Sequence, residues 1–441
     1  MTDLSWLTGN ALLFGGVGFL LTIALIFLEV PVAVAMGLVA LAGCWAVLGV
    51  DGTISIGATT TWDSLTNYTM SVLPLFVLMG NLASHSGLSS RLYGAMRTML
   101  GHRKGGLALA TIGASAGFGM ISGSSLATTA TMGRIALPEM ENAGYSRSLA
   151  AGTVASGGTL GILIPPSTIL VIYAFLSGES IKNLLLATLG PIVLAISLYC
   201  LAVYIPLALG ITKAPHQARS TRAQYRRALA DLLPPVVVFA VIMGGLYLGV
   251  FTANETAAIG VALVLVYGIA SRRLSMKGFL SAAIETSLTC GAIYLVLIAA
   301  NLFNYFLTLS GLPFTFTAMF GPMLENPLLV ILTMTAIYLV LGTLMDSLAM
   351  LLLTVPLFLP VVQAAGIDPI WFGIYAVMVV EIGLITPPVG MNLFVLKATH
   401  PSIRMIELWR GVLPFVLADL IRIFIIIALP AIVVWLPHNT F

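Results

Sequence analysis

Gly161-Ile162-Leu163-Ile164-Pro165-Pro166 recurs 222 residues later as Gly383-Leu384-Ile385-Thr386-Pro387-Pro388, and both copies lie in strongly apolar sequence. The Gly-x-x-x-Pro-Pro pattern cannot continue as a regular helix, because each proline lacks an N–H and its ring clashes with the preceding turn. A broken helix at membrane depth leaves carbonyls that protein, water or an ion must satisfy. Two breaks at matching positions of two halves therefore predict a transporter whose binding site lies at the breaks.

The composition is that of a membrane protein. Hydrophobic residues make up 59% of the 441-residue chain and charged residues 8%, whereas a soluble domain has roughly 25% charged residues. Apolar stretches long enough to cross a bilayer recur between Ala11 and Leu436. With about 20 residues for each helical span, these stretches predict an all-α polytopic membrane protein with roughly 10 to 12 passages or hairpins.

The basic residues gather in segments that border the apolar stretches. Residues 86–104 carry four Lys or Arg and residues 212–230 carry five, and neither segment has an acid. By the positive-inside rule both segments are cytoplasmic. They form no folded basic domain, so their charge does not indicate nucleic-acid binding. Residues 86–104 and 271–286 also mix basic with apolar residues, which predicts amphipathic helices in the membrane interface; an ordinary cytoplasmic loop is the alternative.

The repeat extends beyond the Pro-Pro motif at the same offset. Leu137-Pro138 matches Leu359-Pro360, and Ala143-Gly144 matches Ala365-Gly366. Each half is therefore predicted to contain a small polar cluster, a helix with a proline, an Ala-Gly turn, a second helix, the break and a third helix. An odd number of membrane passages in each half would invert the second copy relative to the first.

A cluster of hydroxyls precedes the first break. Ser122-Gly123-Ser124-Ser125 is followed by Thr128 and Thr129 in apolar sequence. Hydroxyls and freed backbone carbonyls supply uncharged oxygens, which suit a small hard cation such as Na⁺. Ser and Thr also hold membrane helices together, so helix packing is the alternative role of this cluster. Its pairing with a repeated Pro-Pro break favours an ion site.

The second half carries a carboxylate where the first has a hydroxyl. Asp346 lies in the cluster at residues 342–347, at the position equivalent to Ser124. A carboxylate inside a membrane is costly and indicates function. Asp346 is predicted either to bind Na⁺ or H⁺ or to hold the hairpin tip through hydrogen bonds. Glu381, before the second break, could accept a proton or cap freed N–H groups.

Two arginines lie within apolar sequence. Arg134 follows the first hydroxyl cluster, where it could bind a substrate carboxylate bidentately or extend to the membrane interface. Arg422 lies three residues after Asp419 on the last long apolar segment. This spacing on a helix predicts a structural ion pair.

Enzyme signatures are weak in this chain. Gly113-Ala114-Ser115-Ala116-Gly117 fits Gly-x-Ser-x-Gly literally, but a nucleophile elbow requires a strand–turn–helix context. The sequence has no phosphate-binding Walker loop, and its three cysteines lack metal-ligand spacing. We therefore expect no enzymatic activity, no cofactor and no transition metal, and transport driven by a gradient or by a partner.

Four motifs together resemble the large membrane subunit, the M subunit, of tripartite ATP-independent periplasmic (TRAP) transporters. They are Met120–Ser125, Gly157–Ser167, Asn254–Ala258 and Glu381–Asn392. The resemblance spans nearly the whole chain. It implies an elevator-type secondary transporter of the ion-transporter superfamily in a bacterial inner membrane, with two inverted repeats, each containing a helical hairpin and a broken helix.

The resemblance also implies a division between a scaffold, interfacial arm helices and a mobile transport domain. The predicted segments are scaffold helices at 1–85, an arm helix at 86–104, the first transport repeat at 105–190, scaffold helices at 191–270 with the basic loop 212–231, a second arm helix at 271–286, further scaffold or the start of a hairpin at 287–326, the second transport repeat at 327–400 and a C-terminal helix at 401–441.

By similarity to the family, Na⁺ is the coupling ion and occupies two sites. The resemblance places the first site at Ser122, Ser125, Gly161, Ile164 and Pro166 and the second at Gly342, Gly383, Thr386 and Val389. The substrate is expected between them, near Ser124, Arg134, Asp346 and Asn392. Family substrates are mostly carboxylates, such as C4-dicarboxylates, keto acids and sugar acids. Bound Na⁺ and half-helix N-termini would offset the carboxylate charge.

The family further implies two protein partners. A periplasmic substrate-binding P subunit delivers the substrate, and a small four-helix Q subunit lies in the membrane. The sequence before Ala11 is too short for a fused Q subunit, so we expect a separate polypeptide. Two alternatives remain open: a stand-alone H⁺- or Na⁺-coupled carboxylate carrier of the same superfamily and a non-transporting membrane scaffold. The costly broken helices argue against the scaffold.

Overall fold

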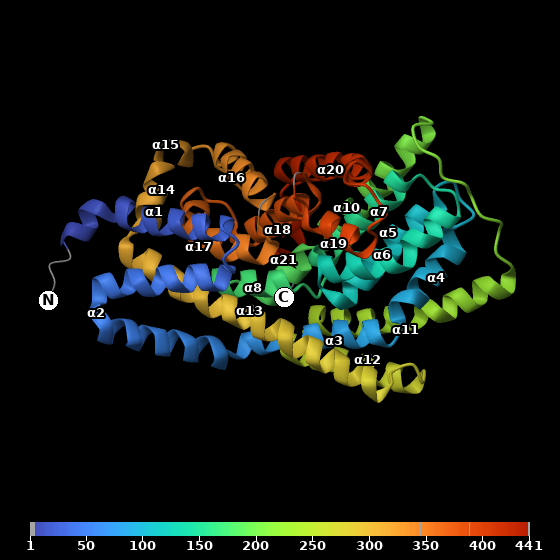
Figure 1. The fold of residues 1–441 in the computed structure, drawn as a ribbon, viewed down its shortest axis with the longest axis horizontal. Helices are drawn as coiled ribbons and strands as arrows, with labels where there is room; N and C mark the ends of the chain where they lie inside the picture. The colour runs from blue at the N-terminus through green and yellow to red at the C-terminus, as the bar shows by residue number, and fades with distance from the viewer. Residues whose placement is uncertain (1–4, 344, 388, 440–441) are drawn as a thin grey trace.

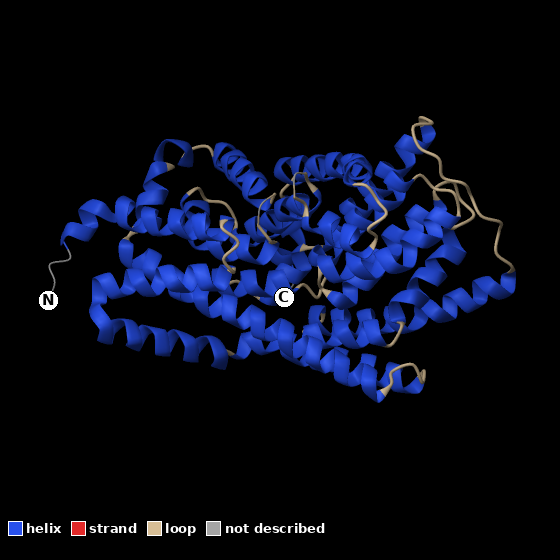
Figure 2. Ribbon diagram, viewed as in Figure 1, coloured by secondary structure: helices blue, strands red, loops and turns tan. Residues whose placement is uncertain are grey.

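Helices form all the regular secondary structure of the residues that the computed structural model describes, which are 5–343, 345–387 and 389–439 (Figure 2). Side chains are described from residue 13 onward. Leu344 of the second polar cluster and Pro388 of the second break therefore lie outside the described residues.

The first half of the chain contains both a hairpin and a broken helix. Its helices are α1 (Ser5–Phe27), α2 (Val32–Thr66), the 3-10 helix η1 (Tyr68–Ser71), α3 (Val72–His85), α4 (Leu88–Leu100), α5 (Gly106–Ser122), α6 (Ser125–Asn142), α7 (Arg147–Leu163), α8 (Thr168–Ser177), α9 (Ile181–Ala187) and α10 (Leu189–Ala208).

The second half repeats this pattern after two further long helices. Its helices are α11 (Arg222–Tyr247), α12 (Ala253–Ala270), α13 (Met276–Ser310), α14 (Leu312–Met319), α15 (Gly321–Leu324), α16 (Pro327–Gly342), α17 (Ser347–Ala364), α18 (Pro369–Ile385), α19 (Met391–Thr399), α20 (Met405–Ala428) and α21 (Ala431–Asn439).

The apolar helices confirm a polytopic membrane protein. Seven described helices are long and apolar enough to cross a membrane, or up to nine if each of two bent helix pairs counts as one span. Four shorter apolar helices, including α5, α16 and α18, accompany them. The sequence-based number of roughly 10 to 12, at about 20 residues for each passage, exceeds the number of full-length spans because it counted hairpins and broken segments as well.

The sequence repeat corresponds to a structural repeat. The bounds of α6 and α17 are both 222 residues apart, and so are those of α7 and α18. The Ala-Gly turns between these helices end in Gly144 at φ 82° and Gly366 at φ 68°, the left-handed region that glycine enters without steric cost. The predicted order of hairpin helix, turn, helix and break is thus confirmed in both halves.

The two predicted arm segments differ from each other. Residues 86–104 contain α4, a separate helix bent by 64° from the preceding helix pair η1–α3. Residues 271–286 do not form a separate helix: Ser275 caps a 35-residue helix, α13, that continues without interruption to Ser310. Nothing after Ser275 breaks the helix, because the segment has no proline and its one glycine lies in the first turn.

Long helices form a layer beside the repeats. Helix α13 packs along α2, and both α12 and α13 pack on α3. Figure 1 shows these helices along the lower side of the molecule and α16 and α20 along the upper side. Many outward residues of this layer are apolar, such as Trp45, Trp62 and Leu288, which agrees with a lipid-facing surface.

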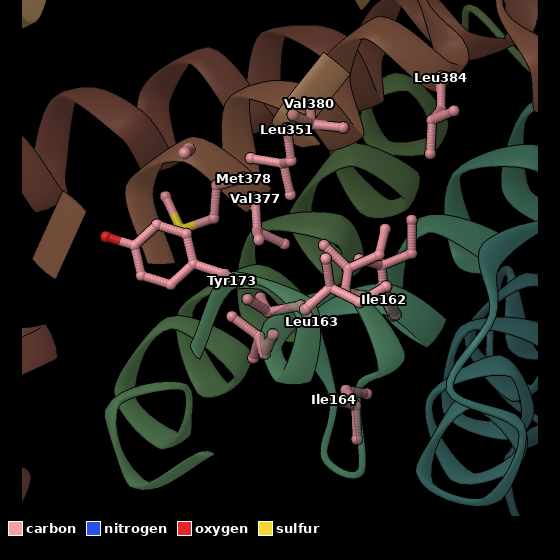
Figure 3. Packing of buried hydrophobic residues seen from close by; sticks show 14 of the residues in the cluster. Ile162, Leu163, Ile164, Tyr173, Leu351, Val377, Met378, Val380 and Leu384 are labelled. Atoms are coloured by element: carbon pink, nitrogen blue, oxygen red, sulfur yellow. The ribbon is translucent and has the colours of Figure 1, made fainter. Parts of the chain in front are cut away.

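The broken helices pack on each other at the centre of the molecule. Helices α7 and α18 are in contact, and they are buried along almost their entire lengths. Figure 3 shows Ile162 and Leu163 of α7 in one apolar cluster with Val377 and Val380 of α18. Each Gly-x-x-x-Pro-Pro segment therefore begins at the C-terminal end of a helix that belongs to this shared core.

Candidate ion and substrate sites at the helix breaks

Both Pro-Pro motifs interrupt their helices as predicted. Helix α7 ends at Leu163 and α8 begins at Thr168, with a bend of 41° between them. Helix α18 ends at Ile385 and α19 begins at Met391. The residues just after α7 and α18, Ile164 and Thr386, have extended backbone with ψ of 126° and 131°. The last carbonyls of each helix are thereby released from the regular hydrogen-bond pattern.

The first hairpin tip lies against the first break. Gly123 has φ 59° and ψ 17° at the end of α5, and a Cβ at this position would lie 2.6 Å from Pro166 O. A Cβ at Gly161 would lie 2.8 Å from Ser124 O and 2.7 Å from Thr128 Oγ1. Glycine is required at both places because the two backbones approach each other so closely.

Uncharged oxygens line this junction. Ser122 Oγ lies 2.9 Å from Thr128 Oγ1, and Thr128 Oγ1 also donates to Ser124 O at 2.8 Å. Thr168, at the start of α8, donates to Gly123 O at 3.2 Å. Hydroxyl and carbonyl oxygens without a carboxylate are the donor set that a small monovalent cation would accept.

Ser125 makes a different contact from its neighbours in the predicted set. Its Oγ lies 2.8 Å from Nδ2 and 3.0 Å from Oδ1 of Asn392, which also donates to Ala155 O at 3.0 Å. Asn392 is fully buried and belongs to α19 of the second repeat. The pair therefore joins α6 of one repeat to α19 of the other, and it places the amide of Asn392 inside the first repeat.

The second hairpin also approaches its break closely. A Cβ at Gly383 would lie 2.5 Å from Gly342 O and 2.6 Å from Gly342 C. Thr386 donates its hydroxyl to Ile382 O at 2.6 Å, which leaves the oxygen lone pairs available to a cation. A Cβ at Gly390 would lie 3.2 Å from Thr386 O, so the chain folds back on itself there.

Val389 lies in this same turn, between Thr386 and Gly390, and only its backbone carbonyl has the chemistry of an ion ligand. Of the predicted second set, the structure thus brings Gly342 directly against Gly383, and it holds Thr386 and Val389 in the loop that follows. In the first set, Ile164 lies in the break between Gly161 and Pro166, and Ser122 lies at the facing hairpin tip.

Asp346 has the hydrogen bonds of a helix cap. Its Oδ1 accepts from Leu348 N at 2.9 Å and Ala349 N at 3.0 Å, at the N-terminus of α17. Of the two roles predicted for this carboxylate, the hydrogen bonds support the one that holds the hairpin tip.

A cavity of about 300 Å³ opens beside the first hairpin tip, between α6 and the helices α3 and α13. Ser122, Ser124 and Arg134 line it from the first repeat, and Asn81 and Glu285 line it from the other side. The Arg134 side chain has no ion-pair partner among the described residues. Two of the four predicted substrate residues, Ser124 and Arg134, therefore share one cavity, whereas Asp346 and Asn392 are engaged elsewhere.

A buried polar network that the sequence indicated only in part lies between the two broken helices. Arg422 Nη2 lies 3.0 Å from Asp419 Oδ1, which confirms the predicted ion pair, and 2.7 Å from Glu381 Oε2. Tyr199 OH donates to Asp419 Oδ2 at 2.8 Å and lies 2.9 Å from Thr159 Oγ1.

Sequence reasoning did not find the partner of Glu381, and it assigned no role to Tyr199. The available signal was the presence of three ionisable residues, Glu381, Asp419 and Arg422, in apolar sequence, since buried charges are almost always paired.

Comparison with known proteins agrees with this architecture. Residues 19–432 match the family described as "Tripartite ATP-independent periplasmic transporter, DctM component". The sialic acid TRAP transporter large permease protein SiaM of Vibrio cholerae is 34% identical over 415 residues, which cover 93% of this chain and 94% of that protein. The C4-dicarboxylate TRAP transporter large permease protein DctM of Pseudomonas aeruginosa is 32% identical over 380 residues, 86% of this chain and 88% of that protein.

Two solved transporter structures share the fold at low sequence identity. The Alcanivorax borkumensis YdaH transporter aligns with a TM-score of 0.63 and 18% identity over 89% of this chain and 90% of its own. Neisseria gonorrhoeae MtrF aligns with a TM-score of 0.62 and 16% identity over 87% and 85%. From the match over residues 19–432 and the identity to the large permeases, the chain belongs to the DctM component family of tripartite ATP-independent periplasmic transporters, which are transporters and not enzymes.

Proposed function

We propose that this protein is the large subunit of a Na⁺-coupled importer of an organic acid, which a periplasmic binding protein delivers. The observation that carries the proposal is the pair of hairpin tips, each in backbone contact with a broken helix, at Gly161 and at Gly383. Each junction gathers uncharged oxygens in a buried setting. Such oxygens bind a small hard cation when water is excluded, and they give the two breaks a use that offsets their cost.

The cavity beside the first tip supports a carboxylate substrate. Arg134 supplies a guanidinium with a fork that matches a carboxylate, and Ser124 supplies a hydroxyl in the same cavity. The names of the relatives point the same way, since SiaM is named for sialic acid, DctM for C4-dicarboxylates and YiaN of Escherichia coli for 2,3-diketo-L-gulonate. All three are organic acids.

The family favours a tripartite assembly over a stand-alone carrier. We assign the chain two partners, a periplasmic binding protein and a smaller membrane subunit, in the inner membrane of a bacterium. We also propose that the two repeats are inverted and move together against the layer of α2, α3, α12 and α13, as an elevator. The cavity supports this division because its two walls belong to the first repeat and to that layer.

The test is uptake into proteoliposomes that contain the permease and its small membrane subunit, with the binding protein outside. Radiolabelled sialic acid and succinate, each with a binding protein that recognises it, are suitable probes. Uptake is expected with an inward Na⁺ gradient and is expected to vanish when K⁺ replaces Na⁺. Equal uptake in K⁺ would overturn Na⁺ coupling.

A matched pair of substitutions locates the ion site. Thr386→Val removes a hydroxyl at the second break. It is expected to raise the half-saturating Na⁺ concentration by about 10- to 100-fold, because the loss of one hydrogen bond to a charged group weakens binding by about that factor. Thr22→Val is the control, because Thr22 is a buried threonine on α1 that donates to Gly18 O at 2.9 Å. An equal half-saturating Na⁺ concentration in both variants would show that Thr386 is not a Na⁺ ligand.

A further inference from the structure

Five polar side chains from four helices form a continuous buried chain, which we call the inter-repeat network. Its members, in order of contact, are Thr159 of α7, Tyr199 of α10, Asp419 and Arg422 of α20 and Glu381 of α18. Each of the four links between neighbours is between 2.7 and 3.0 Å long, and all five side chains are fully buried.

The two ends of the network hold equivalent positions in the repeat. Thr159 and Glu381 are 222 residues apart, and each lies two residues before the glycine of its Gly-x-x-x-Pro-Pro motif. Those glycines, Gly161 and Gly383, are the residues that touch the two hairpin tips. One network therefore contacts both broken helices at equivalent positions, about half a helical turn before the first proposed ion ligand of each break.

Breaking this chain inside the membrane is costly. A buried hydroxyl or charge that loses its partner has no water to replace it, so we expect the four helices to shift together. A displacement of the end of α7 on ion binding would pass through Tyr199 and Asp419 to Arg422, and from there to Glu381 at the end of α18.

We propose that the inter-repeat network couples the two predicted Na⁺ sites, so that Na⁺ bound at one break favours Na⁺ at the other. The inference rests on the proposed function, because it requires the two Na⁺ sites. Tyr199 and Arg422 are positioning residues in this scheme and touch no ion. Coupling between sites is reciprocal and commonly amounts to a factor of about 5 to 150 in affinity. A network that only held the fold together would change stability and leave the Na⁺ response unchanged.

The experiment is a ²²Na⁺ binding isotherm on the permease purified with its small membrane subunit, with choline chloride to keep the ionic strength constant. Tyr199→Phe is expected to lower the Hill coefficient from above one to about one and to raise the half-saturating Na⁺ concentration by about five-fold or more. Tyr338→Phe is the matched control: Tyr338 of α16 is fully buried, and its OH accepts from Thr354 Oγ1 at 3.0 Å. It is expected to bind Na⁺ as the wild type does.

A second pair of variants keeps the test decisive if Tyr199→Phe does not fold. Thr159→Ser retains the hydroxyl and should bind Na⁺ cooperatively, whereas Thr159→Val should lose cooperativity. Wild-type cooperativity in both Tyr199→Phe and Thr159→Val would overturn the inference, and so would a wild-type isotherm without cooperativity, while Na⁺ coupling itself stood. A wild-type protein that bound no Na⁺ would instead overturn the proposed function.

Discussion

The hairpin tips of the two repeats occupy equivalent positions and are held by different groups. At the first tip, Ser124 accepts a single backbone hydrogen bond, from Ala127 N at 3.3 Å. At the second, Asp346 accepts two, at 2.9 and 3.0 Å. Serine in the first repeat again corresponds to aspartate in the second at the start of the next helix. Ser146 makes no side-chain cap there, whereas Asp368 accepts from two N–H groups at 2.7 and 3.0 Å.

This difference separates the roles of charge in the two repeats. The two capping carboxylates of the second repeat, Asp346 and Asp368, are satisfied locally, because a helix N-terminus stabilises a negative charge. The first repeat has hydroxyls at the same positions and presents the guanidinium of Arg134 to the cavity. The proposed carboxylate substrate would meet Arg134 beside the first tip, in a cavity whose opposite wall carries Glu285, 3.1 Å from His85, while the second repeat contributes helix caps. The two copies share helix bounds but not chemistry.

Loss of the arginine in the inter-repeat network should have the largest effect. Arg422→Met removes the guanidinium between Glu381 and Asp419, and it leaves two buried carboxylates without a cation. We expect a destabilisation of about 3–5 kcal/mol, as for other broken buried ion pairs. The midpoint of thermal unfolding of the purified protein in detergent measures it.

The control for this prediction is an arginine at the surface. Arg404 pairs with Glu407 while its side chain is 76% exposed, so Arg404→Met should cost no more than about 1 kcal/mol. Arg422→Lys keeps the charge and should lie between the two. Equal stability of the Arg422→Met and Arg404→Met variants would show that the network does not stabilise the fold.

The sequence could predict the repeat because the residues that shape it act locally. Proline ends a helix and glycine permits a left-handed turn in any protein, so the bounds near Gly144, Gly366 and both breaks followed from the residues alone. The pairing of each polar cluster with its break followed from the repeat, and the assignment of individual Na⁺ ligands followed from the family motifs.

The inter-repeat network could not be predicted in the same way. Its links depend on the packing of α7, α10, α18 and α20, which are far apart in the sequence. Tyr199 lies in no motif, and the contact of Ser125 with Asn392 spans 267 residues. The second arm helix was predicted from charge at 271–286, but charge sets where a segment lies and does not end a helix, so α13 runs through it.

The second-largest loss of stability is expected where each hairpin tip contacts its broken helix. An alanine Cβ at Gly383 would lie 2.5 Å from Gly342 O and 2.6 Å from Gly342 C, so the backbone of α16 would have to move. At Gly161 the nearest atoms are Thr128 Oγ1 at 2.7 Å, in a side chain that can partly rotate, and Ser124 O at 2.8 Å, so the backbone conflict there is smaller than at Gly383 but not absent. Overpacking costs about 1–3 kcal/mol, and we expect Gly383→Ala near the top of that range and Gly161→Ala below it.

Thermal unfolding again provides the measurement, with Gly291→Ala as the control. Gly291 lies within α13 and has no atom within 4 Å of an added Cβ, so alanine there should be neutral or stabilising by up to about 1 kcal/mol. If Gly383→Ala is as stable as Gly291→Ala, the close approach of the second tip to its break is wrong. If Gly161→Ala is the less stable of the two junction variants, the order of the two contacts is wrong.

The caps themselves should give the smallest effect and the sharpest distinction between the two roles predicted for Asp346. Removal of a helix cap costs about 0.5–2 kcal/mol, so Asp346→Ala, which frees two N–H groups, should destabilise more than Ser124→Ala, which frees one. Asp346→Asn keeps an oxygen that can accept from Leu348 N and Ala349 N, and it should restore most of the stability. Na⁺ binding by the same variant then decides the function: a cap predicts a wild-type half-saturating concentration, whereas an ion ligand predicts a rise of about ten-fold or more from the loss of a charged contact. A stable Asp346→Asn protein with weakened Na⁺ binding would show that Asp346 is a Na⁺ ligand and not only a helix cap. The two repeats would then differ in their ion ligands as well as in their caps.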